Sequence, residues 1–243
     1  MSGGDGAGAG IAVRGLTKRF GAVVALDGLD LTVAPGELLA VLGRNGAGKS
    51  TLMRILGTTV LPDAGTATVA GHDVVTAATA ARRSTGLVLG DERSWYWRLS
   101  GRANLEFFAA LYGLRRAAAR RRVAELLDRL GLGEVADRRF DAYSAGMRSR
   151  LSLARALLGE PPVLLLDEPS RTLDPVVAVD LRALVTGLAR DEGRAVLWVS
   201  HDLHEVVAVA DRVVVVAGGH VVAERVRPDD TRELERLLTG TAA

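Results

Sequence analysis

Apolar and polar residues alternate along two segments near the start of the sequence, Ile11–Phe20 and Val23–Val33. A period of two residues is typical of strands with one buried face, and Gly21 and Gly28 punctuate the two segments. The pattern predicts an antiparallel β region. A flexible tail is expected before it, over residues 1–10, which are rich in Gly, Ala and Ser.

Beyond this region, short continuous apolar runs alternate with amphipathic segments. The run Leu38–Leu42 comes first, and a Gly-rich loop and an amphipathic segment follow it. A continuous apolar run is typical of a strand buried on both faces of a parallel sheet. By the same reasoning we expect strands at Gly86–Leu89, Val163–Leu166, Ala195–Val199 and Val213–Val216. We also expect a hairpin at Gly65–Val75, and helices near Val176–Ala189, Leu203–Ala210 and Glu233–Leu238.

The middle of the sequence has helical periodicity only. Apolar residues recur every three or four positions over Ala103–Tyr112, Arg120–Leu130 and Ser144–Leu158, and glycines separate these segments. The sequence therefore predicts an α/β fold with a mostly parallel sheet, an N-terminal antiparallel β subdomain and an all-helical insert at about residues 91–160.

The composition excludes several kinds of chemistry. The 243 residues are 48% hydrophobic and 25% charged, which is typical of a globular protein. Cysteine is absent, so disulfides, thiol nucleophiles and Cys-bound metals are excluded. The net charge is only +2, and we expect no nucleic-acid partner. No apolar run approaches the roughly 18–20 residues of a membrane span and no signal peptide is visible, so we expect a cytosolic chain that reaches a membrane only through a partner.

One segment between a predicted strand and a predicted helix has the spacing of a phosphate-binding loop, G-x-x-x-x-G-K-[ST]. Its glycines would let backbone N–H groups converge on phosphate oxygens at the helix N-terminus. Lys49, one of only two lysines, would reach the β- and γ-phosphates of a nucleotide, and the Ser50 hydroxyl would bind Mg²⁺. The α/β core is thus predicted to be a P-loop NTPase core. The predicted nucleotide-binding residues are Gly43, Arg44, Asn45, Gly46, Ala47, Gly48, Lys49, Ser50 and Thr51.

Two carboxylates, Asp167 and Glu168, follow the predicted strand Val163–Leu166. The carboxyl ends of parallel strands are where α/β sheets bind ligands. We expect Asp167 to hold Mg²⁺ through water and Glu168 to act as the general base on an attacking water. A helix cap or an ion pair is the structural alternative. We favour the catalytic role because Pro169 follows at once and Arg171 is the only basic residue close in sequence.

Three further segments, Tyr143–Met147, Ser170–Asp174 and Ser200–Asp202, stand in a fixed order around these motifs. In this order the chain resembles the ATP-binding subunits of ABC transporters from about Ile11 to Arg227. The resemblance implies one ATPase domain over residues 11–227, a short C-terminal helix or tail over residues 228–243, and ATP and Mg²⁺ as cofactors.

The resemblance also assigns roles to individual residues. Ser144 and Gly146 would bind the ATP of a partner subunit, either a second copy or a paralogue, in a head-to-tail dimer. Two neighbours, Ala145 and Met147, depart from the family's Gly and Gln. His201 would sense the γ-phosphate and position the water beside the catalytic Glu168. Phe20 stands where an aromatic residue usually stacks on adenine.

A glutamine that touches Mg²⁺ in this family is replaced here. Asp91 stands at its position and Glu92 follows. The carboxylate of Asp91 would be an oxygen ligand of Mg²⁺, at the cost of a third acidic group beside Asp167 and Glu168. Whether Asp91 or Glu92 replaces the glutamine stays open.

Aromatic residues concentrate just after this position. Six of the ten lie between residues 95 and 112, namely Trp95, Tyr96, Trp97, Phe107, Phe108 and Tyr112. Helical spacing predicts that the last three pack in the core of the insert. Three consecutive aromatic residues cannot all face one core, and aromatic residues are enriched in interfaces. Because the family docks its membrane subunit beside this segment, we expect a separate multispan transmembrane subunit to dock near Asp91–Trp97 through at least one of the first three.

Arginines recur between residues 115 and 122, and acidic residues follow them. We interpret this segment as a solvated helix face, with Glu125 and Arg129 as an i,i+4 pair, rather than as a surface for lipid or nucleic acid.

The resemblance implies a peripheral ATPase on the cytoplasmic face of the plasma membrane that powers transport. The altered signature segment and the tryptophans look more like exporter than importer subunits. The alternative is a soluble, non-transport ABC ATPase that acts on nucleic acid or ribosomes. Such proteins carry coiled coils, zinc modules or tandem cassettes, and this sequence has none of these features.

Overall fold

The computed structural model describes residues 10–89 and 94–240, so residues 1–9 of the expected tail lie outside the described residues. The strands are β1 (Ile11–Phe20), β2 (Val23–Val33), β3 (Leu38–Leu42), β4 (Ala64–Val69), β5 (His72–Asp73), β6 (Thr85–Leu89), β7 (Val163–Asp167), β8 (Ala195–Val199), β9 (Arg212–Ala217) and β10 (His220–Val226). The helices are α1 (Lys49–Leu56), α2 (Ala78–Arg83), α3 (Gly101–Leu111), α4 (Arg116–Arg129), α5 (Ala145–Ala156), α6 (Pro175–Arg190), α7 (Leu203–Val209) and α8 (Thr231–Gly240), with 3₁₀ turns at Gly133–Val135 and Phe140–Ala142.

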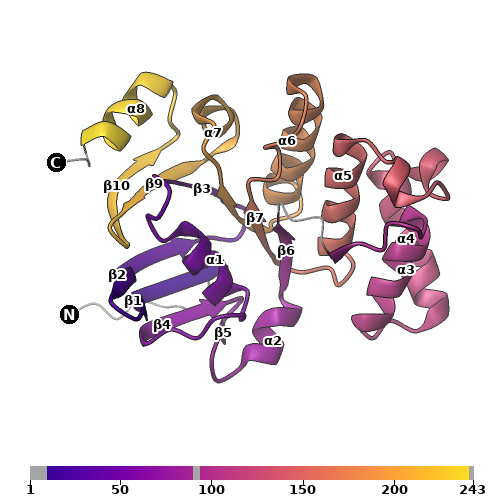
Figure 1. Cartoon of the computed structure of the whole chain (residues 1–243), viewed down its shortest axis with the longest axis horizontal. Coiled ribbons are helices and arrows are strands. Elements are labelled where there is room, and N and C mark those ends of the chain that lie inside the picture. Colours follow the sequence, from indigo (N-terminus) through magenta and orange to yellow (C-terminus); the bar gives the residue numbers. More distant parts are fainter. Residues whose placement is uncertain (1–9, 90–93, 241–243) are drawn as a thin grey trace.

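Two β-sheets form the frame of the molecule. One is four-stranded and antiparallel, in the order β2-β1-β4-β5, and the other is six-stranded, in the order β10-β9-β3-β8-β7-β6. Within the second sheet the pairings are parallel, apart from the antiparallel pair β9–β10. Figure 1 shows α1 beside the antiparallel sheet, whereas α3 and α4 lie at the opposite end of the molecule from both termini. The predicted mostly parallel sheet, antiparallel subdomain and helical region are therefore confirmed.

The central strand β3 is buried on both faces, as its continuous apolar run predicts. Leu38, Ala40 and Leu42 pack into the core formed with α5, α6 and α7, while Leu39 and Val41 pack into the core formed with α1 and the antiparallel sheet. β8 and β9 pair with β3 on either side. This burial holds the carboxyl end of β3, where the phosphate-binding loop begins, in a fixed position relative to the ends of β7 and β8.

Two elements differ from the sequence prediction. The strand β10 lies at the edge of the six-stranded sheet and is mostly exposed, so it lacks the apolar run that marks the buried strands. The short helix α2 has no side chain capping its N-terminus, and it buries only Ala81. Neither element was expected. Within the described ranges, no helix is both long and apolar enough to cross a membrane.

The helical region corrects two details of the sequence analysis. Core packing is confirmed for Phe108 but is wrong for Phe107 and Tyr112, whose exposed fractions are 38% and 44%. α3 buries the face that carries Leu105 and Ala109; Phe107 lies on the other side and Tyr112 follows the end of the helix.

The expected ion pair between Glu125 and Arg129 is also wrong. Glu125 pairs instead with Arg122 one turn earlier, at 2.7 Å, and Arg129 pairs with Glu192. The Arg122 guanidinium additionally donates to the carbonyl of Leu157, which draws this arginine against α5. The other arginines of the segment are exposed, in agreement with the solvated face that the sequence predicts.

Candidate nucleotide-binding site

The phosphate-binding loop connects β3 to α1, and its glycines adopt conformations that other residues rarely reach. Gly46 and Gly48 have φ angles of 83° and 108°. A Cβ atom at Gly48 would lie 2.4 Å from the carbonyl oxygen of Ala25, so a side chain there is excluded by sterics as well. The backbone N–H groups at the start of α1 are thus left without side-chain cover, as a phosphate-binding loop requires.

Lys49 opens α1 and is buried, with an exposed fraction of 6%. Its Nζ atom donates to the carbonyl oxygens of Gly43 at 2.6 Å and Arg44 at 3.1 Å. Burial lowers the pKa of the Lys49 ammonium, while the nearby carboxylates of Glu168 and Asp167 act in the opposite direction. The ammonium therefore lies between the loop carbonyls and the acidic end of β7.

Asp167 ends β7 and is in register with Val199 of β8 and Leu89 of β6. Burial raises the pKa of its carboxyl group, Glu168 raises it further, and Lys49 opposes both. Bringing positive charge to this carboxylate offsets its desolvation, so the site favours a cationic ligand.

Glu168 has a φ angle of 47°, which is uncommon for a residue with a side chain. Its backbone N–H donates to the carbonyl of Val199 at 2.9 Å, which fixes the turn to the end of β8. One carboxylate oxygen, Oε1, lies 2.8 Å from Nε2 of His201, and Oε2 lies 3.3 Å from Arg171. Strained backbone of this kind costs roughly 1–3 kcal/mol and is concentrated at functional sites.

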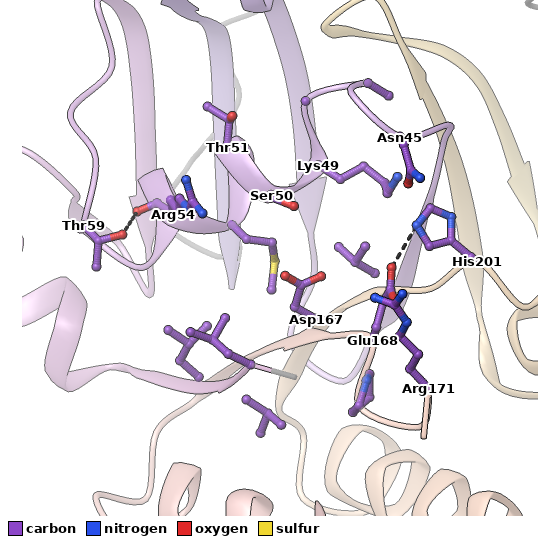
Figure 2. Close-up of a pocket in the computed structure, with 18 of the residues that line it drawn as sticks. Asn45, Lys49, Ser50, Thr51, Arg54, Thr59, Asp167, Glu168, Arg171 and His201 are labelled. Carbon is purple, nitrogen blue, oxygen red and sulfur yellow. Dashed lines mark hydrogen bonds and ion pairs between the residues drawn. The ribbon is translucent and has the colours of Figure 1, made fainter. Parts of the chain in front are cut away.

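These groups line one cavity of about 820 Å³. Figure 2 shows Lys49, Asp167, Glu168 and His201 around it, with the dashed contact between the last two. The predicted residues Asn45 to Thr51 form one wall, and Val23 and Ala25 of β2 extend it. The opposite wall comes from the first turns of α5, through Ala145, Arg148, Ser149 and Ser152.

Several of the predicted site residues are not among the described residues that line this cavity. Gly43 and Arg44 line a smaller neighbouring cavity, together with Leu238 of α8. Phe20, at the end of β1, is 48% exposed. It is not among the described residues that line the cavity of about 820 Å³, which we call the nucleotide cavity. Asp91 and Glu92 lie outside the described residues. The roles assigned to Phe20 and Asp91 stay predictions.

Ser144 caps α5, and its side chain accepts a hydrogen bond from the N–H of Met147 at 3.3 Å. Gly146 packs against α6 so closely that a Cβ atom would lie 2.5 Å from Cγ1 of Val177. Neither residue is among the described ones that line the nucleotide cavity, whereas Ala145 between them is. Ser144 is exposed, and its assignment with Gly146 to the ATP of a partner subunit stays a prediction.

The donors at the end of the loop fit Mg²⁺. Figure 2 shows the Ser50 hydroxyl and the Asp167 carboxylate facing the same space. Among the described residues there is no group of three or more His, Asp or Glu that could hold a metal alone. One hydroxyl and one carboxylate suit Mg²⁺, which usually keeps several waters and is completed by phosphate oxygens.

Sequence reasoning missed two residues near this cavity. Arg148 of α5 lines the cavity and lies over the ring of Trp97, 4.8 Å from its centroid. Glu205 of α7 is a buried carboxylate behind His201. Glu205 stands three residues after the cap residue Asp202, a spacing typical of the first turn of a helix, so the pattern indicated only a local helical role.

Comparisons with known proteins agree with this geometry. A family model described as "ABC transporter" matches residues 26–171. The chain is 47% identical over 218 residues to the daunorubicin resistance ATP-binding protein DrrA3 of Streptomyces coeruleorubidus, covering 88% of this chain and 67% of that protein. It is 42% identical over 214 residues to the daunorubicin/doxorubicin resistance ATP-binding protein DrrA of Streptomyces peucetius, covering 88% and 64% respectively. The chain thus spans about two thirds of the length of these curated relatives.

A solved structure supports the same assignment. The dimeric, post-hydrolysis state of the ATP-binding cassette MJ0796, bound to ADP and Pi, superimposes with a TM-score of 0.79 at 25% identity. The match covers 90% of this chain and 99% of that one. Because the phosphate-binding loop, the paired carboxylates and the family match all lie in one continuous fold, the chain belongs to the ATP-binding proteins of ABC transporters.

Proposed function

We propose that the cavity between the phosphate-binding loop and α5 binds Mg-ATP and hydrolyses it. The N–H groups of Gly46 to Gly48 and the Lys49 ammonium would hold the β- and γ-phosphates. The Glu168 carboxylate would accept a proton from the attacking water, and His201 would orient that carboxylate and contact the γ-phosphate.

Ser50 and Asp167 would hold the Mg²⁺ ion, Asp167 through water. When bound, Mg²⁺ neutralises charge on the phosphates during their transfer. The raised pKa of Asp167 supports this assignment, because a carboxylate that is costly to ionise alone is stabilised by a cation.

The observation that carries the proposal is the contact of 2.8 Å between Glu168 and His201 at the mouth of the loop. It is tested by phosphate release from the purified chain at saturating Mg-ATP. The parent should release phosphate, while Glu168→Gln should bind ATP with similar affinity and release almost none, because an amide does not accept the proton. Normal phosphate release by Glu168→Gln would overturn the proposal.

The active form would be a head-to-tail dimer, formed with a second copy or a paralogous subunit. Ser144 is exposed at the N-terminus of α5, where helix N–H groups favour an anion. Among the described residues, those that line the cavity of the same subunit do not include Ser144. The related cassette bound to ADP and Pi is dimeric. Ser144 and Gly146 would thus complete the partner's ATP site, and two such sites would close a symmetric pair.

A transmembrane subunit would dock on the aromatic turn at residues 95–97. Trp95 is buried and stacks on Phe140 with ring centroids 5.0 Å apart, but Tyr96 and Trp97 are 49% and 42% exposed. Arg148 contacts Trp97 on one side and lines the nucleotide cavity on the other. A partner that displaces Trp97 would therefore act on Arg148, which faces the proposed nucleotide site. This link between the exposed ring and the cavity supports docking at this turn.

The chain would then be a peripheral protein on the cytoplasmic face of the membrane, and the names of the resistance relatives favour export. Purification of the tagged chain from membranes, followed by mass spectrometry, tests the partner. A multispan membrane protein in stoichiometric amount supports transport. Recovery of ribosomes or nucleic acid in its place would favour the non-transport alternative and contradict the proposal.

A further inference from the structure

Glu205 is a buried carboxylate that has no role in the proposed chemistry. It lies in the first turn of α7, and its exposed fraction is 2%. Burying a carboxylate is unfavourable unless hydrogen bonds compensate for the lost water. Capping of α7 does not require this carboxylate, because the side chain of Asp202 already accepts from the N–H groups of His204 and Glu205.

The compensation comes from two serine hydroxyls on two different loops. Ser200 Oγ donates to Oε2 of Glu205 at 2.6 Å, and Ser170 Oγ donates to Oε1. Ser200 Oγ also accepts from the N–H of Asp202 at 3.1 Å, so its own proton is directed to Glu205. The carboxylate thus bridges a residue of the loop after β7 and a residue of the loop after β8.

Each serine is next to one member of the proposed catalytic pair. Ser200 immediately precedes His201, and Ser170 stands two residues after Glu168. A second cavity of about 760 Å³ is lined by Glu168, His201, both serines and Glu205. Backbone contacts also hold these loops, since the N–H of Glu168 donates to the carbonyl of Val199 and the Ser149 hydroxyl donates to the carbonyl of Pro169. The serine bridge adds a tie between the side chains beside the catalytic pair, so its loss would let Glu168 and His201 shift relative to one another.

We propose that Glu205 is a positioning residue that sets the alignment of His201 with Glu168 by holding Ser170 and Ser200 at a fixed separation. The inference rests on the proposed roles of Glu168 and His201. Glu205 itself transfers no proton: it lies behind the reacting pair and acts only as an acceptor for the two hydroxyls.

The test uses two substitutions of different chemistry. Glu205→Ala removes both acceptors and should lower kcat for ATP hydrolysis by about 10- to 100-fold, because small misplacements of reacting groups have effects of that size. Its KM for Mg-ATP should change less than about 3-fold. Glu205→Gln should recover kcat to within about 3-fold of the parent, because its amide oxygen still accepts from Ser200 and its NH₂ group donates to Ser170 Oγ. A Glu205→Gln variant as impaired as Glu205→Ala would show that charge matters, and would overturn a purely positional role.

A matched control separates positioning from simple loss of helix stability. Val206→Ala truncates the neighbouring, fully buried residue of α7 and leaves the serine bridge intact. It should lower Tm but leave kcat unchanged at a temperature where the variant is folded. The His201 imidazole C–H signal in a ¹H–¹³C NMR spectrum should shift in Glu205→Ala and not in Val206→Ala, a difference that general destabilisation does not produce.

The serines provide an independent variant should Glu205→Ala fail to fold. Ser170→Ala and Ser200→Ala should each lower kcat in the same direction, and each should have little further effect when combined with Glu205→Ala. Glu168→Gln is measured in parallel. If Glu168→Gln hydrolyses ATP normally, the proposed site is wrong; if it is inactive while folded Glu205→Ala keeps parental kcat, the positioning inference alone is wrong.

Discussion

Nε2 of His201 lies 2.8 Å from Oε1 of Glu168, although the two residues follow different strands of the sheet. Register brings them together, because Asp167 of β7 pairs with Val199 of β8 and each functional residue follows shortly after. Arg171 contacts the other oxygen of Glu168 at 3.3 Å, but its side chain is 77% exposed. The His201 side chain is 44% exposed and its contact is shorter, so His201 is the stronger determinant of the carboxylate's orientation.

His201→Ala is therefore expected to lower kcat for ATP hydrolysis by about 100-fold or more, as loss of a group aligned with a general base does. Mg-ATP binding should weaken much less than kcat falls, since only one γ-phosphate contact is lost and the phosphate-binding loop is unaltered. Arg171→Ala is the matched control and should keep kcat within about 3-fold. Steady-state phosphate release measures both variants, and equal effects of the two substitutions would refute the dominant role of His201.

Lys49→Ala should abolish tight Mg-ATP binding. In the proposed site the ammonium would provide the positive charge at the β- and γ-phosphates, and its present acceptors are carbonyls of the loop itself. Isothermal titration calorimetry with Mg-ATP measures the affinity, and circular dichroism checks that the fold is retained. Arg225→Ala removes a cationic side chain that pairs with Glu233 and is not among the described residues that line the cavity, and it should bind ATP as the parent does. An unchanged affinity in Lys49→Ala would remove the nucleotide-binding assignment.

Gly146→Ala should destabilise the protein by about 1–3 kcal/mol, because its Cβ would lie 2.5 Å from the stiff side chain of Val177. In a Val177→Ala background the nearest atom of residue 177 becomes its Cβ, at 3.7 Å, which is an ordinary contact. There the same substitution should be neutral or stabilising, since Ala favours helix over Gly by about 1 kcal/mol. Urea unfolding of the four proteins measures this change of sign; equal destabilisation in both backgrounds would exclude the clash.

The tryptophans at 95 and 97 should respond differently to truncation. Trp95→Ala removes a buried ring and should destabilise the protein by about 3–5 kcal/mol. Trp97→Ala removes a 42% exposed ring and a cation–π contact worth about 1 kcal/mol, so the fold and the basal ATPase rate should persist. What Trp97→Ala should lose is stimulation of the ATPase by the membrane subunit in reconstituted vesicles. Full stimulation in Trp97→Ala and also in Tyr96→Ala, which removes the other exposed ring of this turn, would place docking elsewhere.

Local patterns predicted the parts of the site that local geometry determines. The phosphate-binding loop follows from glycine spacing after a buried strand, and the approach of Glu168 to His201 follows from two strands that end at the same edge. Contacts between side chains that are far apart in the sequence are not marked by any local pattern. Glu205 reaches Ser170, 35 positions earlier, and Arg148 reaches Trp97, and neither contact has a period or spacing in the sequence.

The same limit explains the wrong expectations. Helical spacing placed Phe107 in the core, but which face of α3 is buried depends on where α4 and α5 pack against it. The edge strand β10 and the short helix α2 bury too little to leave an apolar pattern.

In the proposed mechanism Glu168 is needed to hydrolyse ATP and not to bind it, in a site shared by two subunits. The most direct measurement is size-exclusion chromatography of Glu168→Gln with Mg-ATP, followed by analysis of the nucleotide that co-elutes with the protein. We expect a dimer that carries two unhydrolysed ATP molecules, while the same variant without ATP should elute as a monomer. Co-eluting ADP, or a monomer at saturating ATP and every protein concentration, would contradict this mechanism.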